Sequence, residues 1–332
     1  MVLGLAALAL GPGWGCGRRI DLPGEPDMGN GQPGEVAYYK KYAWNSMPLL
    51  SDLLVTRGQL FFAVVDSALV RSYFSDAATP RENASRSIPD PVVLAGDTLR
   101  RPVQVCEGAG STIWVAYRRP RSQVVQFDVS VSPPVTTGLR VRNTGTVEFG
   151  GLAADPDSGF VYVADTQANT VSKFAPTTTG GNLVARLAID GMGDGYVRAP
   201  RGIYFFQDSL LVADSGKDWL QVISADRPAN GRGQVEIKRR DEQGQLQSEP
   251  IKGPSDVWVD AVGFFYVADT GNSRVLKLKR SGEIKEVVTE FDPYRAMQPL
   301  TMAASPTLVW VADPDSARLT IYQINTSSEG LP

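Results

Sequence analysis

The stretch that decides the fold is FFYVADTGNSRVLKL, residues 264–278. An apolar run rich in β-branched and aromatic residues ends at Asp269, a turn of Thr, Gly, Asn and Ser follows, and an alternating run starts at Val275. This order is typical of a β-hairpin. Because Asp side chains accept backbone N–H groups in tight turns, we interpret Asp269 as a residue that fixes the turn and therefore the register of the two strands.

The same cassette recurs along the chain, clearly at 160–174, 210–223 and 308–322 and in weaker form at 60–74 and 112–127. The equivalent anchor positions in chain order are Asp66, Tyr117, Asp165, Asp214, Asp269 and Asp313. Successive anchors lie 51, 48, 49, 55 and 44 residues apart. A period of this length predicts one four-stranded propeller blade per copy.

Two further strands complete each predicted blade. A short apolar strand after Pro or Gly precedes every hairpin and is expected to be the innermost strand of its blade. Fourth strands are expected near Val92–Leu94, Leu139–Arg142, Leu183–Ala188, Gln234–Lys238 and Glu283–Val288. The last copy ends after its third strand, so the strand-like segment Glu35–Trp44 is predicted to pair with it and close the ring. The expected architecture is an all-β, six-bladed β-propeller over residues 35–326 with four-stranded antiparallel blades, followed by a tail at 327–332.

These cassettes resemble NHL repeats, in which a Pro-x-Gly-Ile segment precedes a Val-Ala-Asp-Thr-Gly-Asn-x-Arg-Val turn. Residues 254–278 carry most of that pattern, including VADTGNSRV at 267–275, and the linker at 190–203 resembles the glycine-rich segment that precedes an NHL repeat. The resemblance covers about residues 45–325 and is strongest in the last four copies. It implies an NHL- or TolB-like propeller but no particular activity, because propellers host many unrelated functions.

The first 34 residues differ from the repeats. Residues 1–16 place an apolar segment, MVLGLAALAL, before a small-residue stretch and Cys16, which resembles a bacterial lipoprotein signal with Cys16 as the lipid acceptor. Two departures are the lack of a positive residue before the apolar segment and Gly13 three positions before the cysteine. Residues 17–34, rich in Gly, Pro and charge, are expected to be a flexible tether. We predict a bacterial cell-envelope protein, anchored by lipid; secretion and a cytosolic location remain open alternatives.

Composition removes several function classes. The chain has no histidine, which excludes Ser-His-Asp and Cys-His catalysis and His-ligated zinc. A net charge of −3 provides no general attraction for nucleic acid. No run of 18 apolar residues is present that would span a bilayer. With only Cys16 and Cys106, no disulfide framework is implied, and Cys106 is expected to be a buried structural thiol.

A second kind of propeller suggests an enzymatic alternative. Calcium-dependent lactonases and gluconolactonases, which this fold resembles, gather acidic and amide ligands at the start of their innermost strands. At the corresponding positions of this sequence Asp256 is the only carboxylate, whereas calcium takes six to eight oxygen ligands. We therefore predict no cofactor and no metal site, with calcium kept open through loop ligands. Trp258 is expected to lie in the core between blades.

One face of the ring is the predicted binding surface. The turn between the second and third strands of a blade and the loop before the innermost strand should lie on the same face. That face carries arginines and a tyrosine suited to recognition. The predicted binding residues are Arg118, Arg119, Arg121, Asp194, Tyr196, Arg198, Arg201, Asp256 and Arg295.

Three functions follow from these observations. The leading one is an envelope-anchored, non-enzymatic binding or scaffolding module for a protein or glycan partner. The second is a metal-assisted hydrolase or lyase of the lactonase kind. The third is a purely structural component of an envelope assembly. The sequence leaves the ligand and the oligomeric state open.

Overall fold

A computed structural model describes most of the repeat region. The described residues are 38–45, 47, 50–56, 59–64, 70–75, 79–88, 92–94, 96–191, 193, 195–226, 233–289, 297–305, 307–313 and 317–324. The predicted lipid acceptor Cys16 and two predicted binding residues, Asp194 and Arg295, lie outside this part of the chain. No helix within it has the length and apolarity that a membrane crossing requires.

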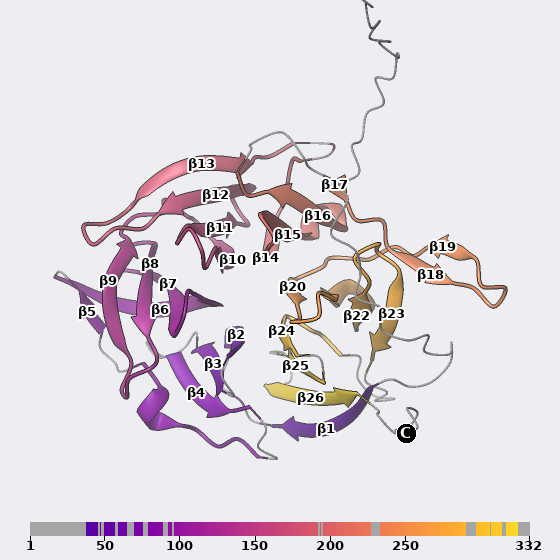
Figure 1. Cartoon of the computed structure of the whole chain (residues 1–332), viewed down its shortest axis with the longest axis horizontal. Helices are drawn as coiled ribbons and strands as arrows, with labels where there is room; N and C mark the ends of the chain where they lie inside the picture. Colours follow the sequence, from indigo (N-terminus) through magenta and orange to yellow (C-terminus); the bar gives the residue numbers. More distant parts are fainter. Residues whose placement is uncertain are drawn as a thin grey trace, which may run out of the picture.

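The chain forms an all-β propeller whose antiparallel sheets mostly have four strands (Figure 1). The first sheet has three strands, β2 (Leu50–Thr56), β3 (Gln59–Val64) and β4 (Val70–Phe74). The second has five, β5 (Val92–Leu94), β6 (Asp97–Glu107), β7 (Thr112–Arg119), β8 (Gln123–Asp128) and β9 (Val135–Val141). The third has four, β10 (Phe149–Ala154), β11 (Val161–Asp165), β12 (Thr170–Ala175) and β13 (Asn182–Ala188).

Three further four-stranded sheets complete the circuit. The next comprises β14 (Pro200–Phe206), β15 (Ser209–Asp214), β16 (Trp219–Ser224) and β17 (Gly233–Gln234). It is followed by β20 (Asp256–Val259), β21 (Phe265–Asp269), β22 (Arg274–Leu278) and β23 (Ile284–Val288). The last comprises β24 (Thr301–Ala304), β25 (Leu308–Asp313), β26 (Arg318–Ile324) and the N-terminal strand β1 (Tyr38–Trp44).

The innermost strands surround the axis of the ring. Each contacts the next, in the order β2, β6, β10, β14, β20 and β24, and β24 contacts β2 again. Apolar side chains from neighbouring sheets pack between them, so the core is a set of inter-sheet clusters and not one central mass. Side chains and backbone of the innermost strands line the space around the axis.

The N-terminal strand lies at the outer edge of the last sheet. β1 pairs antiparallel with β26, with Ala43 opposite Thr320 and Trp44 opposite Leu319. Trp44 is fully buried and packs with Leu50 and Leu53 of the first sheet and Ile321 of the last. Residues from both ends of the chain therefore share one apolar cluster.

The expectation of four strands in every blade is wrong for the first copy. Within the described residues its sheet has three strands, and five other sheets have four or five. Val92–Leu94, the expected fourth strand, forms a hairpin with the first half of β6 instead. This is possible because β6 is 11 residues long: Asp97–Leu99 pair with β5 and the following residues pair with β7. Gly96, at φ +85°, occupies the tight turn, where a left-handed backbone favours glycine.

Asp66, the anchor predicted for the first copy, lies outside the described residues, and the register puts the equivalent position two residues earlier. In other sheets the anchor lies opposite the first residue of the innermost segment, as in the pairs Pro102–Tyr117 and Pro200–Asp214. In the first sheet the equivalent pair is Leu50–Val64, so Val64 takes the place that the sequence pattern gave to Asp66. A register irregularity follows each of these pairs. This is expected of a β-bulge, which changes the direction in which the next side chains point.

The predicted role of the anchor aspartates in their turns is confirmed at Asp165. Asp165 accepts N–H groups of Gln167 and Ala168 within its own turn and those of Val147 and Glu148 before β10. Asp165 thus fixes its hairpin turn and ties it to the chain that leads into the innermost strand. Asp214 and Asp269 make the second kind of link, since they accept the N–H groups of Arg198 and Lys252.

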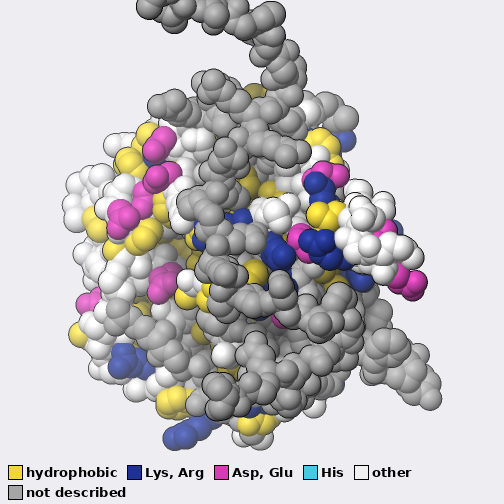
Figure 2. Space-filling model, turned by 45° about the vertical axis from the view of Figure 1, so that its right-hand side comes forward, with side chains coloured by type: hydrophobic (Ala, Val, Ile, Leu, Met, Phe, Trp, Pro, Cys, Tyr) yellow, Lys and Arg dark blue, Asp and Glu magenta, His cyan; other side chains and the backbone are white. Residues whose placement is uncertain are grey.

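The long connection between β16 and β20 contains a hairpin, β18 (Lys238–Arg240) with β19 (Leu246–Ser248). This hairpin projects from the ring (Figure 1). Basic and acidic side chains lie together where it joins the ring (Figure 2). Arg240 pairs with Glu283 at 2.7 Å, and Arg239 pairs with Glu249 at 3.3 Å. The Arg240–Glu283 pair joins the hairpin to the residue before β23, and the Arg239–Glu249 pair lies within the connection that contains the hairpin.

Candidate functional site

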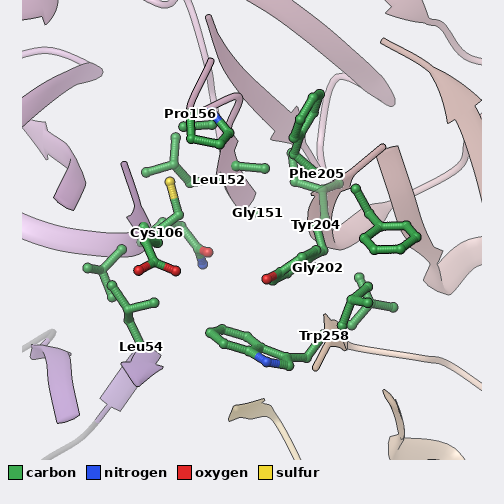
Figure 3. Close-up of a pocket in the computed structure, with 18 of the residues that line it drawn as sticks. Leu54, Cys106, Gly151, Leu152, Pro156, Gly202, Tyr204, Phe205 and Trp258 are labelled. Carbon is green, nitrogen blue, oxygen red and sulfur yellow. The ribbon is translucent and has the colours of Figure 1, made fainter. Parts of the chain in front are cut away.

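A cavity of about 910 Å³ occupies the channel between the innermost strands. Its wall is built from β2, β6, β10, β14 and β20, together with the turns that follow several of them. Tyr204 and Trp258 face Cys106 and Leu54 across the cavity (Figure 3). A volume of this size matches the range of small-molecule sites in proteins.

Two carboxylates form the inner end of the cavity. Asp52, on β2, accepts N–H groups of Leu53 at 2.9 Å and Val105 at 2.8 Å. Asp256, the first residue of β20, accepts the N–H groups of Val257 and Met302, both at 2.8 Å. The hydroxyl of Thr301 lies 2.9 Å from an oxygen of each carboxylate and joins them. The channel positions next to them are small, since a Cβ at Gly202 would collide with the Asp256 side chain.

Burial changes the acidity of this pair. Loss of hydration raises the pKa of Asp52 well above its ordinary value, and the nearby charge of Asp256 raises it further. Burial likewise raises the pKa of Asp256 to about 6, against the opposing effect of its hydrogen bonds. The cost of placing two negative charges here therefore favours a shared proton.

Aromatic rings from β14 and β20 line the opposite wall. The centroids of Tyr204 and Trp258 lie 5.2 Å apart with the rings tilted by 57°, and both side chains are half-buried. Burial and the charge of Glu107 raise the pKa of the Tyr204 hydroxyl, which therefore stays protonated as a hydrogen-bond donor. The prediction that Trp258 belongs to the core is only partly right: it packs against core clusters and also lines the cavity.

Cys106 also lines the cavity, which the sequence did not predict. It is a free, half-buried cysteine on β6. Burial raises the pKa of its thiol well above the ordinary value, and the carboxylates of Asp52 and Glu107 raise it further. The thiolate needed for nucleophilic attack is thereby disfavoured, so this side chain acts as a small apolar wall group.

The cavity opens at the carboxyl ends of its strands. Of its lining residues near the strand starts, Asp52, Gly151 and Gly202 are buried, and Gln104 and Asp256 are half-buried. Its lining residues near the strand ends, such as Glu107, Asp157 and Asp208, are exposed. The mouth is therefore on the face opposite to the predicted binding face.

The predicted binding residues on β7 and its turn are exposed. Arg118 and Arg119 end β7, and Arg119 lies opposite Arg100 in the register of β6 and β7. Arg121 pairs with Asp97 at 3.3 Å, and the same carboxylate pairs with Arg142 at 3.4 Å. Arginines are thus brought together at this edge of the second sheet.

The remaining predicted residues are distributed over later sheets. Tyr196, Arg198 and Arg201 are exposed around the start of β14. The backbone N–H of Arg198 donates to the anchor Asp214 at 2.9 Å. Asp256 is separated from these exposed residues by its position inside the channel, where it contacts β24.

The sequence missed Asp52 as a channel residue. Asp52 lies opposite Ala63, as Gln104 lies opposite Ala116 and Asp256 opposite Ala268. In the weak first copy the segment opposite Val64 begins at Leu50, two residues after Pro48, so a pattern counted from that proline does not place Asp52 in the channel. The usable signal was an aspartate inside an otherwise apolar predicted strand. Within the described residues, no group of three or more His, Cys, Asp or Glu side chains is arranged to hold a metal ion.

Comparison with known proteins identifies the fold. No family model matches the chain, and no curated protein matches it by sequence. Among solved structures, a Bacteroides thetaiotaomicron protein of unknown function is 14% identical, with a TM-score of 0.59 over 87% of this chain and 76% of that one. A protein of the nidogen/laminin complex is 14% identical, with a TM-score of 0.54 over 77% of this chain and 85% of that one.

An enzyme is also among the similar structures. A variant of virginiamycin B lyase from Staphylococcus aureus, solved with quinupristin, is 10% identical, with a TM-score of 0.53 over 87% of this chain and 99% of that one. In that variant one histidine is replaced by alanine and the enzyme is catalytically inactive. At these identities the similarities establish a propeller fold and no particular activity.

Proposed function

We propose that this chain is a non-enzymatic binding propeller of the bacterial cell envelope, which holds a small ligand in its channel and docks a protein or glycan partner at its arginine-bearing face. The observation that carries this proposal is the channel cavity, with aromatic groups on one wall and hydrogen-bonding groups at its inner end. Such a combination, apolar surface with a few fixed polar groups, is what small-molecule recognition requires.

The chemistry of the lining favours binding over catalysis. No histidine exists in the chain, and the Cys106 thiol is held protonated. The similar lyase loses its activity when one histidine is replaced. A ligand in this channel would meet donors, acceptors and rings, but no activated nucleophile among the described residues.

The number of blades, the closure of the ring and the membrane anchor are part of the same proposal. We infer an NHL-like propeller of six blades, in which the three-stranded sheet β2–β4 counts as a blade because it takes its place in the circle of innermost strands. The pairing of β1 with β26 supports closure of the ring by the N-terminal strand. Cys16 would then anchor the propeller through the tether at residues 17–34.

A second candidate function is supported by the carboxylate pair. Two carboxyl groups that share a proton can act as acid and base, and the raised pKa of Asp256, about 6, suits that role near neutral pH. In this alternative the channel performs a hydrolase or lyase reaction of the lactonase kind without histidine. Calcium assistance would require loop ligands in addition to Asp52 and Asp256.

The test is to follow what the channel captures. The full-length protein, purified in mild detergent after incubation with the low-molecular-weight fraction of an envelope extract, is examined by native mass spectrometry. We expect a stoichiometric small ligand that is released chemically unchanged. Trp258→Leu should reduce its occupancy about tenfold, because burial of the indole ring is lost. Trp219→Leu, a change of the same type outside the channel, is the matched control.

Two results would contradict the proposal. Equal occupancy in both tryptophan variants would place the ligand elsewhere. Conversion of the captured compound to a product, abolished by Asp256→Asn, would support the hydrolase or lyase alternative.

A further inference from the structure

The channel lining has an unusual charge composition. Six of its residues are acidic, and no Lys or Arg is among the described residues that line it. The acidic lining residues are Asp52, Glu107, Asp157, Asp208, Asp256 and Asp260. A concave site with charges of one sign concentrates counter-ions of the other sign, so this cavity attracts cations.

Internal partners leave this negative charge largely uncompensated. Asp260 accepts three backbone N–H groups and the Tyr266 hydroxyl, and Glu107 accepts the Thr56 hydroxyl at 2.9 Å. Asp52 and Asp256 are held by backbone N–H groups and Thr301. In the described part of the chain, none of the six carboxylates has a Lys or Arg nitrogen within 4.0 Å. Neutral donors orient these groups but do not cancel their charge, so only the proton that Asp52 and Asp256 share reduces the total.

The fold shows elsewhere how a cation is held by such groups. The Lys173 ammonium lies 4.1 Å from the ring centroid of Phe160 and 5.7 Å from that of Tyr162. It also pairs with the Asp226 carboxylate at 2.8 Å. The same set recurs in another sheet at Lys277, Phe264, Tyr266 and Glu286. In both places two aromatic rings and one carboxylate surround an ammonium group.

The channel combines the same kinds of group without a cation of the chain. Tyr204 and Trp258 present half-buried rings to the cavity (Figure 3), and carboxylates from β2, β6 and β20 share its lining. Among the described residues, no Lys or Arg lies over either ring. Aromatic faces attract cations, and the attraction is strongest where water is excluded.

We propose that the channel ligand is an organic cation, an amine or quaternary ammonium compound with an apolar or aromatic body. The cationic group is held between the Tyr204 and Trp258 rings and the surrounding carboxylates. The apolar body contacts the aliphatic wall that includes Leu53, Leu54 and Leu152. This inference rests on the proposed function, because it names the ligand class of the same site.

Three probes with one phenyl body and different charge test the ligand class. They are 2-phenylethylammonium, 2-phenylethanol and 3-phenylpropanoate, each titrated into the full-length protein by isothermal calorimetry at low salt. We expect the ammonium probe to bind at least about tenfold more tightly than the neutral alcohol, and the carboxylate probe to bind weakest. The preference should decrease as ionic strength rises.

Matched variants locate the effect. Glu107→Gln should reduce ammonium affinity several-fold and leave alcohol affinity unchanged, since the amide keeps the size of the side chain and removes its charge. Glu242→Gln, the same change at an exposed site on the β18–β19 hairpin, should leave the affinity for the ammonium probe and for the alcohol probe unchanged. Trp258→Leu should weaken the ammonium probe more than the alcohol.

The outcomes separate this inference from the proposed function. Equal affinity for the ammonium and the alcohol, with both lost in Trp258→Leu, would overturn the cation class and leave channel binding intact. Tightest binding of the carboxylate probe, or no measurable binding of the ammonium probe, would also overturn it. The capture experiment on envelope extract then decides independently whether the channel binds any ligand.

Discussion

Asp52 and Asp256 lie on two sides of one hydroxyl group: an oxygen of each is 2.9 Å from Oγ1 of Thr301. A hydroxyl has one proton and can donate it to only one acceptor. If both contacts are hydrogen bonds, the second requires a proton on a carboxyl group. The pair therefore retains a proton more readily than isolated carboxylates, in agreement with the raised pKa of both residues.

This pair should make stability depend on pH. Because the pKa of Asp256 is raised from 3.8 to about 6 in the folded protein, the folded state binds more protons than the unfolded chain between those values. The stabilising contribution is complete below pH 3.8 and is lost as pH rises through about 6. We expect Asp256→Asn to reduce this loss by about 1–3 kcal/mol.

The free energy of unfolding of the unchanged protein and of Asp256→Asn is measured by urea denaturation from pH 4 to 7.5. Other carboxylates with lowered pKa, such as Glu249 and Glu283, titrate in both proteins and cancel in the difference. Parallel curves would show that Asp256 does not titrate abnormally.

The N-terminal strand should be needed for a soluble ring. Removal of residues 1–34 leaves β1 and its pairing with β26 in place, so a monodisperse protein is expected. Removal of residues 1–45 deletes the buried Trp44 and exposes the edge of β26, which should cause aggregation. Size-exclusion chromatography with light scattering compares the two proteins. Equal solubility would show that closure does not depend on β1.

The anchor Asp269 should be a major determinant of stability. Its fully buried carboxylate accepts the Lys252 N–H at 2.7 Å and pairs with Arg274 at 2.6 Å. Asp269→Ala leaves the mostly buried guanidinium without this partner, and we expect a loss of about 3–5 kcal/mol. The exposed Asp157, replaced by Ala, serves as the control and should change stability by less than about 0.5 kcal/mol. Thermal or urea denaturation measures both, and similar losses would refute the assigned role.

The arginine-bearing face should contribute to capture of an acidic partner and little to stability. Arg118 and Arg201 are exposed and make no ion pair with a described residue. Their joint replacement by Ala should weaken pull-down of an envelope partner while the melting temperature stays within about three degrees, since exposed charges stabilise little. Undiminished capture would exclude this face as the docking surface.

Lipid attachment at Cys16 should determine where the protein is found. Two acyl chains give stable membrane anchoring where one does not. Cys16→Ser should therefore move the protein from the membrane pellet to the soluble fraction, as followed by immunoblotting after ultracentrifugation. A substituted protein that still sediments would mean that another segment or a partner retains it.

Most of the fold could be predicted because its information is local. Each hairpin is specified within about 15 residues by alternation and by the turn around its anchor residue, as at Asp165 and Asp269. The repetition of this unit predicts a ring, because each sheet must cover its neighbour. The prediction was wrong where the local signal is weak, in the first copy, where β5 pairs forward with β6.

The candidate site depended on tertiary structure. Thr301 and Asp52 are 249 residues apart in the chain and meet only because the ring brings β24 beside β2. Bulges at the start of several innermost strands decide which side chains face the channel, and an error of one or two residues in register hides them from a sequence pattern. The sequence by itself determined the strands, their turns and the repeated sheet. Only the closed ring determined that two aspartates, a free cysteine and a tyrosine–tryptophan pair share one cavity, because packing between distant segments is not encoded in any local pattern.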